Sequence, residues 1–510
     1  MQGAQKTGWT SAANGLDVAM PNSQGLWDVE LVPSVQNGTL PESRLRDMGE
    51  RIVAAWFYSN LDSVELLTGE GLVADFASPH PLTEARDPAA RRSILQAAEE
   101  GHVLVKNTNS ALPLKSPRIL SLFGYDATAP EIFNIPISGF TGWNFGTTSL
   151  NLQDSELFGL LFQQVEYPQS GKFGTLFVGG GSGGNSPAYL STPHAAISSR
   201  AQEDGTSLFW NFNRTELDPR VNAESTACLV FINDYAAEGH DRQGLADPDS
   251  DTLVANVALK CPNTIVITHN AGLRVLDFAD NPNVTAIILA HLPGQDSGKA
   301  LTNILYGDVS PSGKIPYTIP LTAEDYGPLL SPVVTPPLAP EDNLSDPSEM
   351  DYKYFQLTST TPRYHFGYGL SYTSFSLSEI HVAWSEEPPT AGAAPEPGTK
   401  IPGGAASLFT TIATARVTVS NTGHCAGAEV AQLYLRRPGD AEGVWHLRGF
   451  EKVFLDAGES KIVEMELRRK DLSAWSEEGQ EWVLAEGRFE VGVGSSADAG
   501  GFEGVGVLEL

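Results

Sequence analysis

The sequence predicts a layered α/β domain followed by a β-sandwich of the immunoglobulin type. Between residues 84 and 322, short apolar runs alternate with stretches of helical spacing, as in buried parallel strands that are joined by helices. Residues 405–510 alternate apolar and polar side chains with a period of two, which is typical of sandwich strands. A segment rich in Pro, Gly and Ala, residues 385–404, separates the two patterns, and we assign residues 323–404 to a connecting segment and linker.

Five short apolar runs define the α/β part. Each run is bounded by Gly, Asn or Pro, which is typical of strands buried on both faces of a parallel sheet. The runs are RILSLFG (118–124), GTLFVGGG (174–181), ACLVFIND (227–234), NTIVITHN (263–270) and VTAIILAH (284–291). Crossover helices are predicted over residues 249–261 and 296–307, and residues 88–107 predict a helix followed by a short strand. We therefore expect a layered α/β sandwich domain over residues 84–322.

Residues 1–65 fit neither pattern. The stretch PESRLRDMGERIVAAWFY (41–58) carries apolar residues at helical spacing, and Pro41 with Glu42 suits a helix start. The segment thus predicts apolar helix faces but no strands against which these faces could be buried. We expect it to be the end of another domain and not the start of one.

The bulk composition is that of a folded, acidic chain. Of the 510 residues, 41% are hydrophobic and 18% are charged, which is typical of globular proteins. The formal net charge is −30, and such a surface repels nucleic acid and anionic membranes. No apolar stretch reaches the length of about 18 residues that predicts a membrane span. We therefore expect a neutral or cationic partner, with no nucleic acid and no membrane.

The three cysteines are Cys228, Cys261 and Cys425, which are too few for a disulfide framework or a zinc site. Cys228 and Cys261 each precede a strand-like run. If those strands are parallel neighbours, the two sulfur atoms could meet and form a disulfide. Two buried thiols are the alternative, and the pattern leaves both open.

Glu238 is the first candidate for chemistry. It lies in YAAEGHDRQG (235–244), a loop directly after the buried run ACLVFIND, and α/β proteins place active-site residues at such strand ends. Its carboxylate could be an acid, a base or a metal ligand, or it could be an exposed loop residue without a role. Asp241 and Arg242 lie within its reach in the same loop, and Arg242 could serve only to orient the loop.

The loop GGGSGGNS (179–186) is the second candidate. Residues 180–184 match the G-x-S-x-G pattern of a serine-hydrolase elbow, but the residues that follow form a poor helix start. The Gly-Lys-Ser/Thr ending of a phosphate loop is absent. We expect instead a flexible loop whose backbone, at Gly181 and Ser182, approaches a ligand closely, and a plain structural turn is the alternative.

The histidines do not form a metal motif. The scattered ones are His102, His194, His240, His269 and His291. No H-E-x-x-H pattern occurs, so we expect no metal. Asp296 precedes a predicted helix, and we interpret it as a carboxylate that the helix dipole favours.

Several longer stretches are similar to sequence motifs of one enzyme family. In the α/β part these are GHVLVKNTNSALPL (101–114), FVGGGSGGNSPAY (177–189), VFINDYAAEGHDR (230–242), residues 261–318 and YHFGYGLSYTSF (364–375). Together they resemble glycoside hydrolase family 3, and the fungal β-glucosidases most closely. VTVSNTGHCAGAEVAQLYL (417–435), HLRGFEKVFLDAGES (446–460) and DLSAW (471–475) resemble the fibronectin type III-like domain of that family. The resemblance covers nearly the whole chain.

The resemblance implies a barrel, an α/β sandwich and a fibronectin type III-like domain, in that order. Residues 1–65 would then be the remnant of a (β/α)8 barrel, and residues 405–510 the fibronectin type III-like domain. It also implies hydrolysis of terminal β-linked sugars with retention, by two carboxylates and without a cofactor. It assigns the acid/base role to Glu238, which would protonate the glycosidic oxygen and then activate water.

The resemblance further implies a nucleophilic aspartate in a Ser-Asp-Trp motif of the barrel. The family usually continues with Gly-Ala-Gln-x-Thr and Gly-Leu-Asp-x-x-Met-Pro, which MQGAQKTGW and GLDVAMP resemble here. The nucleophile is therefore expected just before Met1, and Asp17, in the second motif, is not the nucleophile. We expect a truncated gene model, with a genuine short product as the alternative, and little or no hydrolysis by this chain.

The expected function is that of a retaining β-glucosidase-type hydrolase acting on β-linked glucosides or cello-oligosaccharides, as in cellulose or β-glucan degradation. A non-catalytic carbohydrate-binding protein is one alternative, and a β-xylosidase or N-acetylglucosaminidase of the same family is another. The intact parent is expected to be secreted, although the amino-terminal residues are not those of a signal peptide. N-glycosylation triplets begin at Asn37, Asn213, Asn283 and Asn343. The oligomeric state stays open.

Overall fold

The computed structural model describes residues 5, 7–19, 23, 25–63, 79, 86–130, 174–179, 187–236, 242, 244–330, 350–396 and 398–510. The chain forms two compact units, residues 1–72 with 331–345 and residues 73–330 with 346–510. Over the described ranges, no helix combines the length and the apolar character that crossing a membrane requires.

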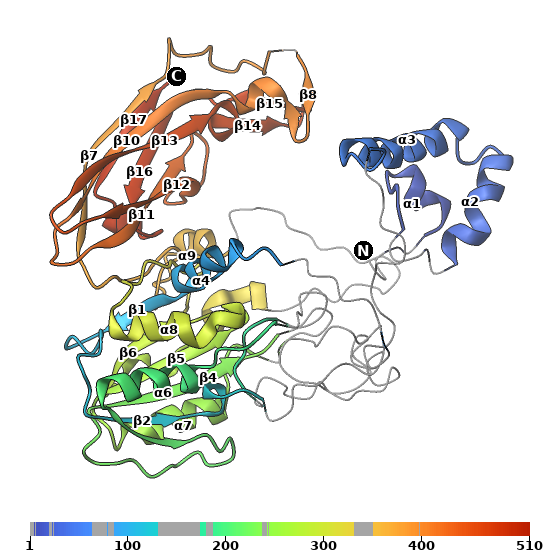
Figure 1. Cartoon of the computed structure of the whole chain (residues 1–510). Helices are drawn as coiled ribbons and strands as arrows, with labels where there is room; N and C mark the ends of the chain where they lie inside the picture. Colours follow the sequence, from blue (N-terminus) through green and yellow to red (C-terminus); the bar gives the residue numbers. More distant parts are fainter. Residues whose placement is uncertain are drawn as a thin grey trace. The chain divides into compact units, whose positions relative to one another are not determined.

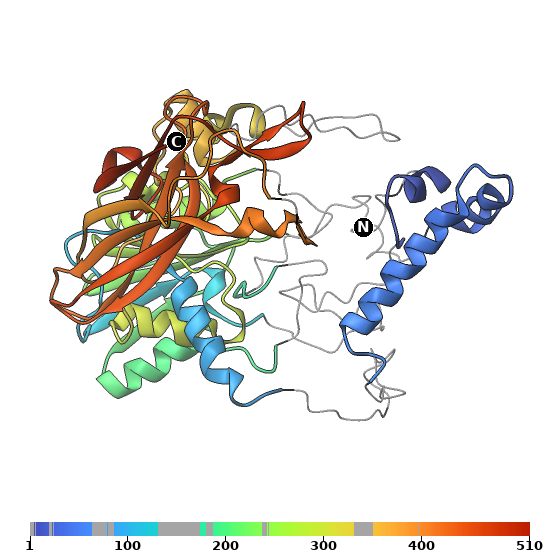
Figure 2. The ribbon, with the colours of Figure 1, turned by 90° about the horizontal axis from the view of Figure 1, so that it is seen from above.

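The described part of the first unit is helical (Figure 1). Its helices are α1 (Trp9–Ala13), α2 (Leu26–Gln36) and α3 (Glu42–Tyr58), and Figure 2 shows α3 as the long straight one. α3 begins directly after Pro41, as predicted. Its apolar residues are poorly covered, since Trp56 is 42% and Phe57 is 57% exposed. Its assignment to the end of a barrel stays a prediction.

The α/β part of the second unit is built on a sheet in the order β1-β6-β5-β4-β2-β3. β2 to β6 run parallel, and β1 pairs antiparallel with β6 at the edge. The strands are β1 (Val103–Asn107), β2 (Ile119–Phe123), β3 (Ser207–Asn211), β4 (Ala227–Asp234), β5 (Thr264–Asn270) and β6 (Val284–Leu289). The predicted runs 118–124, 227–234, 263–270 and 284–291 are thus confirmed as strands.

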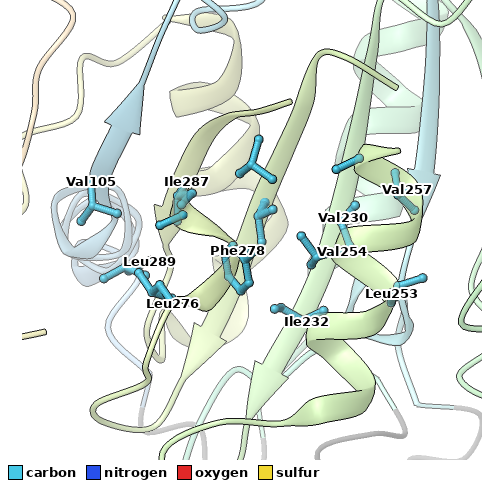
Figure 3. Packing of buried hydrophobic residues seen from close by; sticks show 14 of the residues in the cluster. Val105, Val230, Ile232, Leu253, Val254, Val257, Leu276, Phe278, Ile287 and Leu289 are labelled. Atoms are coloured by element: carbon cyan, nitrogen blue, oxygen red, sulfur yellow. The ribbon is translucent and has the colours of Figure 1, made fainter. Parts of the chain in front are cut away.

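Helices cover both faces of this sheet, which is why its central strands are continuously apolar. The helices are α4 (Ala90–Gly101), α6 (Pro193–Asp204), α7 (Pro248–Ala258) and α8 (Ser297–Tyr306). On one face, Val230 and Ile232 of β4 pack with Val254 of α7 (Figure 3). On the other face, alternate residues of β4 such as Phe231 pack in a second core with Ile197 of α6 and Leu301 of α8. The predicted layered α/β sandwich is confirmed.

One predicted strand is wrong and another was missed. GTLFVGGG (174–181) forms no strand over its described residues 174–179. Its residues are buried, but their hydrogen bonds go elsewhere: the Thr175 N–H donates to the Thr128 carbonyl, and the Leu176 N–H donates to the side chain of Asp126. The missed strand is β3, SLFWN, which is half-exposed at the sheet edge and whose apolar run, Leu208 to Trp210, is shorter than that of β4.

Cys228 and Cys261 form a disulfide, which settles the alternative that their pattern left open. Cys228 lies in β4, and Cys261 follows α7, the helix that leads from β4 to its parallel neighbour β5. The crossover from β4 to β5 therefore brings the sulfur of Cys261 back to the start of β4, where Cys228 lies. Cys425 is exposed and free.

The carboxyl-terminal part is a β-sandwich of two antiparallel sheets, in the orders β13-β10-β7 and β12-β11-β16-β17. Their strands are β7 (Phe375–Trp384), β10 (Thr411–Asn421), β11 (Gly427–Arg436), β12 (His446–Leu455), β13 (Ser460–Arg468), β16 (Arg488–Gly494) and β17 (Gly504–Glu509). Two short hairpins add β8 (Lys400–Ile401), β9 (Gly404–Ala405), β14 (Ser473–Ser476) and β15 (Glu481–Leu484). Alternate residues of β10, such as Val417 and Val419, are fully buried, as a period of two predicts.

The sandwich includes residues that we assigned to the connecting segment 323–404. β7 pairs with β10 over most of its length, from Phe375 opposite Asn421 to Trp384 opposite Ala413. We predicted that the sandwich begins after the Pro-rich stretch. In the structure this stretch follows β7 and links that strand to the rest of the sandwich, so the sandwich begins earlier in the chain. The helix α9 (Tyr352–Thr358) lies in the part that does connect the two domains.

Candidate active site

Polar side chains gather where the parallel strands end. β4 ends in Asn233 and Asp234, β5 ends in His269 and Asn270, and none of the four is more than 8% exposed. The strands are neighbours in register, with Asn233 beside His269 and Asp234 beside Asn270. Because α/β proteins bind ligands in the crevice outside the carboxyl ends of such strands, this edge is the candidate active site.

Asp126 and His269 form a buried pair at this edge, and both are 0% exposed. The His269 Nδ1–H donates to Asp126 Oδ2, while Asp126 Oδ1 accepts hydrogen bonds of 2.7 Å from Asn233 Nδ2 and 2.8 Å from the Leu176 N–H. Burial raises the pKa of Asp126, and the nearby His269 and the hydrogen bonds oppose this shift. One carboxylate therefore ties the ends of β4 and β5 to the segment that precedes the Gly-rich loop.

The hydrogen bonds continue from His269 to α8. His269 Nε2 lies 2.8 Å from Ser297 Oγ, at the first residue of that helix. The hydrogen bonds thus connect Asp126 to His269 and His269 to Ser297, as they connect the Asp, His and Ser of a serine-hydrolase triad. Ser297 is 0% exposed, however, so a substrate cannot reach its hydroxyl. We therefore interpret this chain of hydrogen bonds as a support that holds α8 against the strand ends.

The bases of the two predicted loops lie together. Gly179 opens GGGSGGNS, and Ala236 is two residues before Glu238. A Cβ atom placed on Gly179 would lie 3.9 Å from the Ala236 carbonyl oxygen. The Phe177 carbonyl accepts a hydrogen bond of 2.8 Å from the Gly294 N–H, in the turn that leads to α8. The two segments therefore leave the carboxyl edge of the sheet next to each other. Loops that contribute residues to one site must lie close together in this way.

Arg274 fixes the last residue of β4. Its Nη1 donates to both carboxylate oxygens of Asp234 at 2.7 Å, and its Nη2 donates to Asp251 of α7 at 2.5 Å. The guanidinium is almost fully buried. Burial disfavours its charge, but the two carboxylates outweigh burial and raise the pKa of Arg274. The chain therefore enters the Glu238 loop from an anchored position.

Arg242 is described in the structure and lies against the turn that follows β5. Its Nη2 donates to the Leu273 carbonyl. Gly272 adopts a φ of 100°, and a Cβ atom there would lie 4.0 Å from Nη2. Burial lowers the pKa of Arg242. Its Nη1 is buried and finds no hydrogen-bond partner in the described part of the chain. The contact with Leu273 suits a residue that orients the loop.

His291 follows β6 at the same edge. Its Nε2 lies 2.9 Å from the Tyr317 hydroxyl, which accepts a hydrogen bond of 2.7 Å from Asn270 Nδ2. The backbone of His291 has a φ of 54°, a value that residues other than glycine rarely adopt. Burial lowers the pKa of His291, so the ring stays neutral near pH 7. Such strained residues are concentrated at functional sites.

Asp296 is the N-cap residue of α8, in line with the prediction that it lies at a helix amino terminus. Its side chain makes no capping hydrogen bond to that helix. Instead, Oδ1 accepts a hydrogen bond of 2.7 Å from the Tyr189 hydroxyl. The residue therefore ties the segment after the Gly-rich loop to the start of α8.

The other predicted site residues, which are Glu238, Gly181, Ser182 and Asp241, lie outside the described residues, and their roles stay predictions. The same holds for residues 180–184 of the serine-elbow pattern. Sequence reasoning missed Asp126, Asp234 and Arg274. For Asp234 a signal was present, since the pairs Asn-Asp and His-Asn directly end two of the predicted strand runs. No pattern singles out Asp126 or Arg274, because their partners lie far away in the sequence.

The chain was compared with known proteins. Residues 102–372 match the glycosyl hydrolase family 3 C-terminal domain, and residues 429–497 match a fibronectin type III-like domain. A probable beta-glucosidase M of Aspergillus fumigatus is 45% identical over 499 residues, which are 97% of this chain and 61% of that protein. The beta-glucosidase cel3A of Pyricularia oryzae is 42% identical over 493 residues, 96% of this chain and 61% of that protein. The chain therefore spans about three fifths of the length of these relatives.

Solved structures show the same similarity. The beta-D-glucoside glucohydrolase of Trichoderma reesei superposes with a TM-score of 0.81 at 31% identity, over 99% of this chain and 66% of that one. The α/β sheet with its polar carboxyl edge, the sandwich and these similarities lead to one conclusion. This chain belongs to glycosyl hydrolase family 3.

Proposed function

We propose that this chain supplies the acid/base part of a retaining β-glucosidase site, with Glu238 as the acid/base. The observation that carries the proposal is the anchored end of β4 beside Gly179. Asn233 binds the buried Asp126, Asp234 binds the buried Arg274, and Glu238 follows Asp234 by four residues. A loop that starts from anchored residues can hold a carboxylate in a defined position. General acid–base catalysis requires such positioning.

The proposed reaction uses two carboxylates with different roles. In a retaining hydrolase, the nucleophile and the acid/base lie about 5–5.5 Å apart across the glycosidic bond. Glu238 would donate its proton to the leaving oxygen while the nucleophile forms a bond to the anomeric carbon. Glu238 would then take a proton from water, and the resulting hydroxide equivalent would release the sugar. The β-configuration is retained because two displacements occur.

We propose that the nucleophile is not among these 510 residues. The family resemblance assigns that role to an aspartate ahead of residue 1, and Asp17 is a poor substitute. Asp17 Oδ1 lies 2.6 Å from Arg44 Nη2, and Arg51 also lies near this carboxylate. A carboxylate held between two arginines is a weaker nucleophile than a free one. The chain tested by itself should therefore hydrolyse little or no glycoside.

The substrates we propose are β-linked glucosides, including cello-oligosaccharides. The support is that the relatives described above are named as β-glucosidases. The net charge of −30 agrees with an uncharged substrate, because it would repel an anionic one.

Hydrolysis of 4-nitrophenyl β-D-glucoside by purified 1–510, beside Glu238→Gln, tests this proposal. We expect no turnover by either protein, with circular dichroism and thermal unfolding confirming that both are folded. Turnover that Glu238→Gln abolishes would place a nucleophile inside this chain and overturn the half-site proposal. Turnover that Glu238→Gln leaves unchanged would overturn the role of Glu238.

We also propose that the parent protein passes through the secretory pathway. The Cys228–Cys261 disulfide supports this, because structural disulfides are rare in reducing compartments. Asn213 is exposed, and its Oδ1 accepts hydrogen bonds from both the backbone and the hydroxyl of Thr215. Asn283 is half-buried instead, and its Nδ2 donates to the Ala258 carbonyl at 2.9 Å.

Peptide mass analysis of protein secreted from a fungal host tests this second proposal. We expect a glycan on Asn213 and none on Asn283, since the amide nitrogen of Asn283 is engaged. An unmodified Asn213 in a protein that carries glycans elsewhere would contradict the expectation drawn from exposure. Cys228 and Cys261 found as free thiols would remove the structural support for secretion.

A further inference from the structure

A pocket of about 470 Å³ lies where the connecting segment meets the β-sandwich. One side is formed by α9 and the residues after it, including Tyr352, Gln356 and His365. The other side is formed by loops of the sandwich, including Asp498 and Gly500. The volume lies within the range of about 300–1,000 Å³ that is typical of small-molecule sites. The pocket is remote in sequence from the Glu238 loop and shares no residue with the candidate active site.

The walls of this junction pocket are held together by hydrogen bonds. The Gln356 side chain donates to the Ala497 carbonyl at 2.9 Å and accepts from the Trp445 N–H at 3.0 Å. The Tyr352 hydroxyl accepts from the Leu447 N–H at 3.0 Å. Tyr352 also packs against Phe366, with ring centroids 4.9 Å apart. The pocket is therefore formed before any ligand arrives, and binding would cost little ordering of the protein.

Backbone strain marks both ends of α9. Asp351, before the helix, has φ 47° and ψ −130°, and Ser359, after it, has φ 54°. A residue other than glycine seldom adopts such angles, because they are sterically unfavourable. Asp351 is held there by a hydrogen bond of 2.9 Å from the Thr318 N–H. The hydrogen bonds of Asp351, Gln356 and Tyr352 therefore hold α9 in the orientation that shapes the pocket wall, in spite of this strain.

The chemistry of the lining points to an uncharged, hydroxyl-rich ligand. The lining contains hydroxyl, amide and aromatic side chains, but it contains no lysine or arginine. Its titratable side chains near neutral pH are those of His365 and Asp498, whose Nε2 and Oδ2 atoms lie 4.0 Å apart. This separation is too long for a direct hydrogen bond, but one hydroxyl oxygen about 2.8 Å from each atom can bridge them. An anionic ligand would be repelled by Asp498 and would find no basic residue to bind it.

We propose that the junction pocket is a non-catalytic binding site for a neutral saccharide of one or two sugar rings. A sugar hydroxyl bridges His365 and Asp498, while the apolar face of the ring lies against the aromatic wall near Tyr352. Asp498 is the only carboxylate in the lining, and hydrolysis requires two. The site therefore binds sugar without cleaving it, and the proposal does not depend on the role of Glu238.

Titration of the full 1–510 chain with D-glucose and with cellobiose tests this proposal. Isothermal calorimetry gives the affinity, and the imidazole resonances of His365 in a ¹H–¹⁵N spectrum report on the location. We expect saturable binding in the millimolar range and a shift of the His365 resonances. Asp498→Asn should weaken binding about tenfold or more, because it removes the charge that strengthens the hydrogen bond. Asn can still accept the hydrogen bond of 3.1 Å that Gly500 N–H gives to Asp498 Oδ1.

Two further variants serve as controls. His446→Gln alters another His–Asp pair of the sandwich, 3.4 Å from Asp440, and should leave binding unchanged. In Glu238→Gln, which alters the candidate active site, the shift of the His365 resonances on titration should persist. Binding that only Glu238→Gln weakens would assign the sugar to the candidate active site and overturn the proposal. So would the absence of saturable binding up to about 50 mM of either sugar, or His365 resonances that do not respond.

Discussion

Lys314 Nζ lies 2.7 Å from Glu429 Oε1, and this ion pair joins the α/β domain to strand β11 of the sandwich. Both side chains are close to nine-tenths buried. Lys314 also donates to the Gly369 carbonyl at 3.0 Å. A second ion pair between the same two domains, Lys452 with Glu100 of α4, is 2.6 Å long but about one-third exposed. The two pairs allow a matched comparison of buried and exposed charge at one junction.

Lys314→Met should destabilise the second unit more than Lys452→Met. Removing Lys314 leaves Glu429 buried without its partner, which typically costs about 3–5 kcal/mol. Removing Lys452 leaves Glu100 in contact with water, which costs about 0–1 kcal/mol. Urea unfolding of both variants measures the difference. Equal losses of unfolding free energy would show that burial does not decide the strength of these pairs.

Removal of the disulfide should destabilise the α/β domain. Cys228 and Cys261 are 33 residues apart, and closing a loop of that size restricts the unfolded chain by about 3–4 kcal/mol. The double variant Cys228→Ala/Cys261→Ala should lose that much unfolding free energy, as measured by chemical denaturation. Cys425→Ser is the matched control and should change little, because Cys425 is exposed and unpaired. An unaffected double variant would argue that the bond does not constrain this domain.

Stability should fall below neutral pH through His102. The imidazole is 0% exposed, its Nδ1 hydrogen-bonds the Ala98 carbonyl at 2.6 Å, and burial lowers its pKa to about 3. In the unfolded chain the pKa returns to about 6.5. The unfolded state therefore binds one more proton between these values, so the stabilisation present above pH 6.5 is lost as the pH falls toward 3.

His102→Gln isolates this contribution, since glutamine does not titrate and can still donate to Ala98. The difference in unfolding free energy between wild type and His102→Gln should shrink by up to about 1.4 kcal/mol per pH unit below pH 6.5. Urea unfolding at several values from pH 7 to 4.5 measures it. Parallel stability curves for the two proteins would contradict the assignment.

Asp126→Asn should loosen the strand ends that support the Glu238 loop. The amide can still accept from Asn233 and Leu176, but its nitrogen cannot accept from the His269 N–H. A buried donor left without its acceptor costs about 1–3 kcal/mol. Urea unfolding should show this loss. Asp280→Asn should change the unfolding free energy by less than about 1 kcal/mol, because Asp280 is a largely exposed partner of Arg363.

The main elements of this fold could be predicted because they depend on local pattern. The runs that became β4 and β5 have apolar central residues and are buried throughout, since helices cover both of their faces. The segment 174–179 shows the limit of this signal. It is largely buried, as a strand would be, but the Asp126 side chain and the Thr128 carbonyl accept its backbone hydrogen bonds in place of a neighbouring strand. Conversely, β3 escaped prediction because its apolar run, Leu208 to Trp210, is short.

Local pattern also explains why Glu238 could be singled out and its surroundings could not. A glutamate just after a buried strand is visible in the order of the residues, as are the strands, the crossover helices and the period of two in the sandwich. The pairing of Asp126 with His269, of Asp234 with Arg274 and of Cys228 with Cys261 is not visible there. Nor is the junction pocket, in which His365 and Asp498 are more than a hundred residues apart in the chain. Periodicity reports which face of an element is buried, whereas these contacts depend on the order of the strands and on how the domains pack, which arise only when distant segments meet.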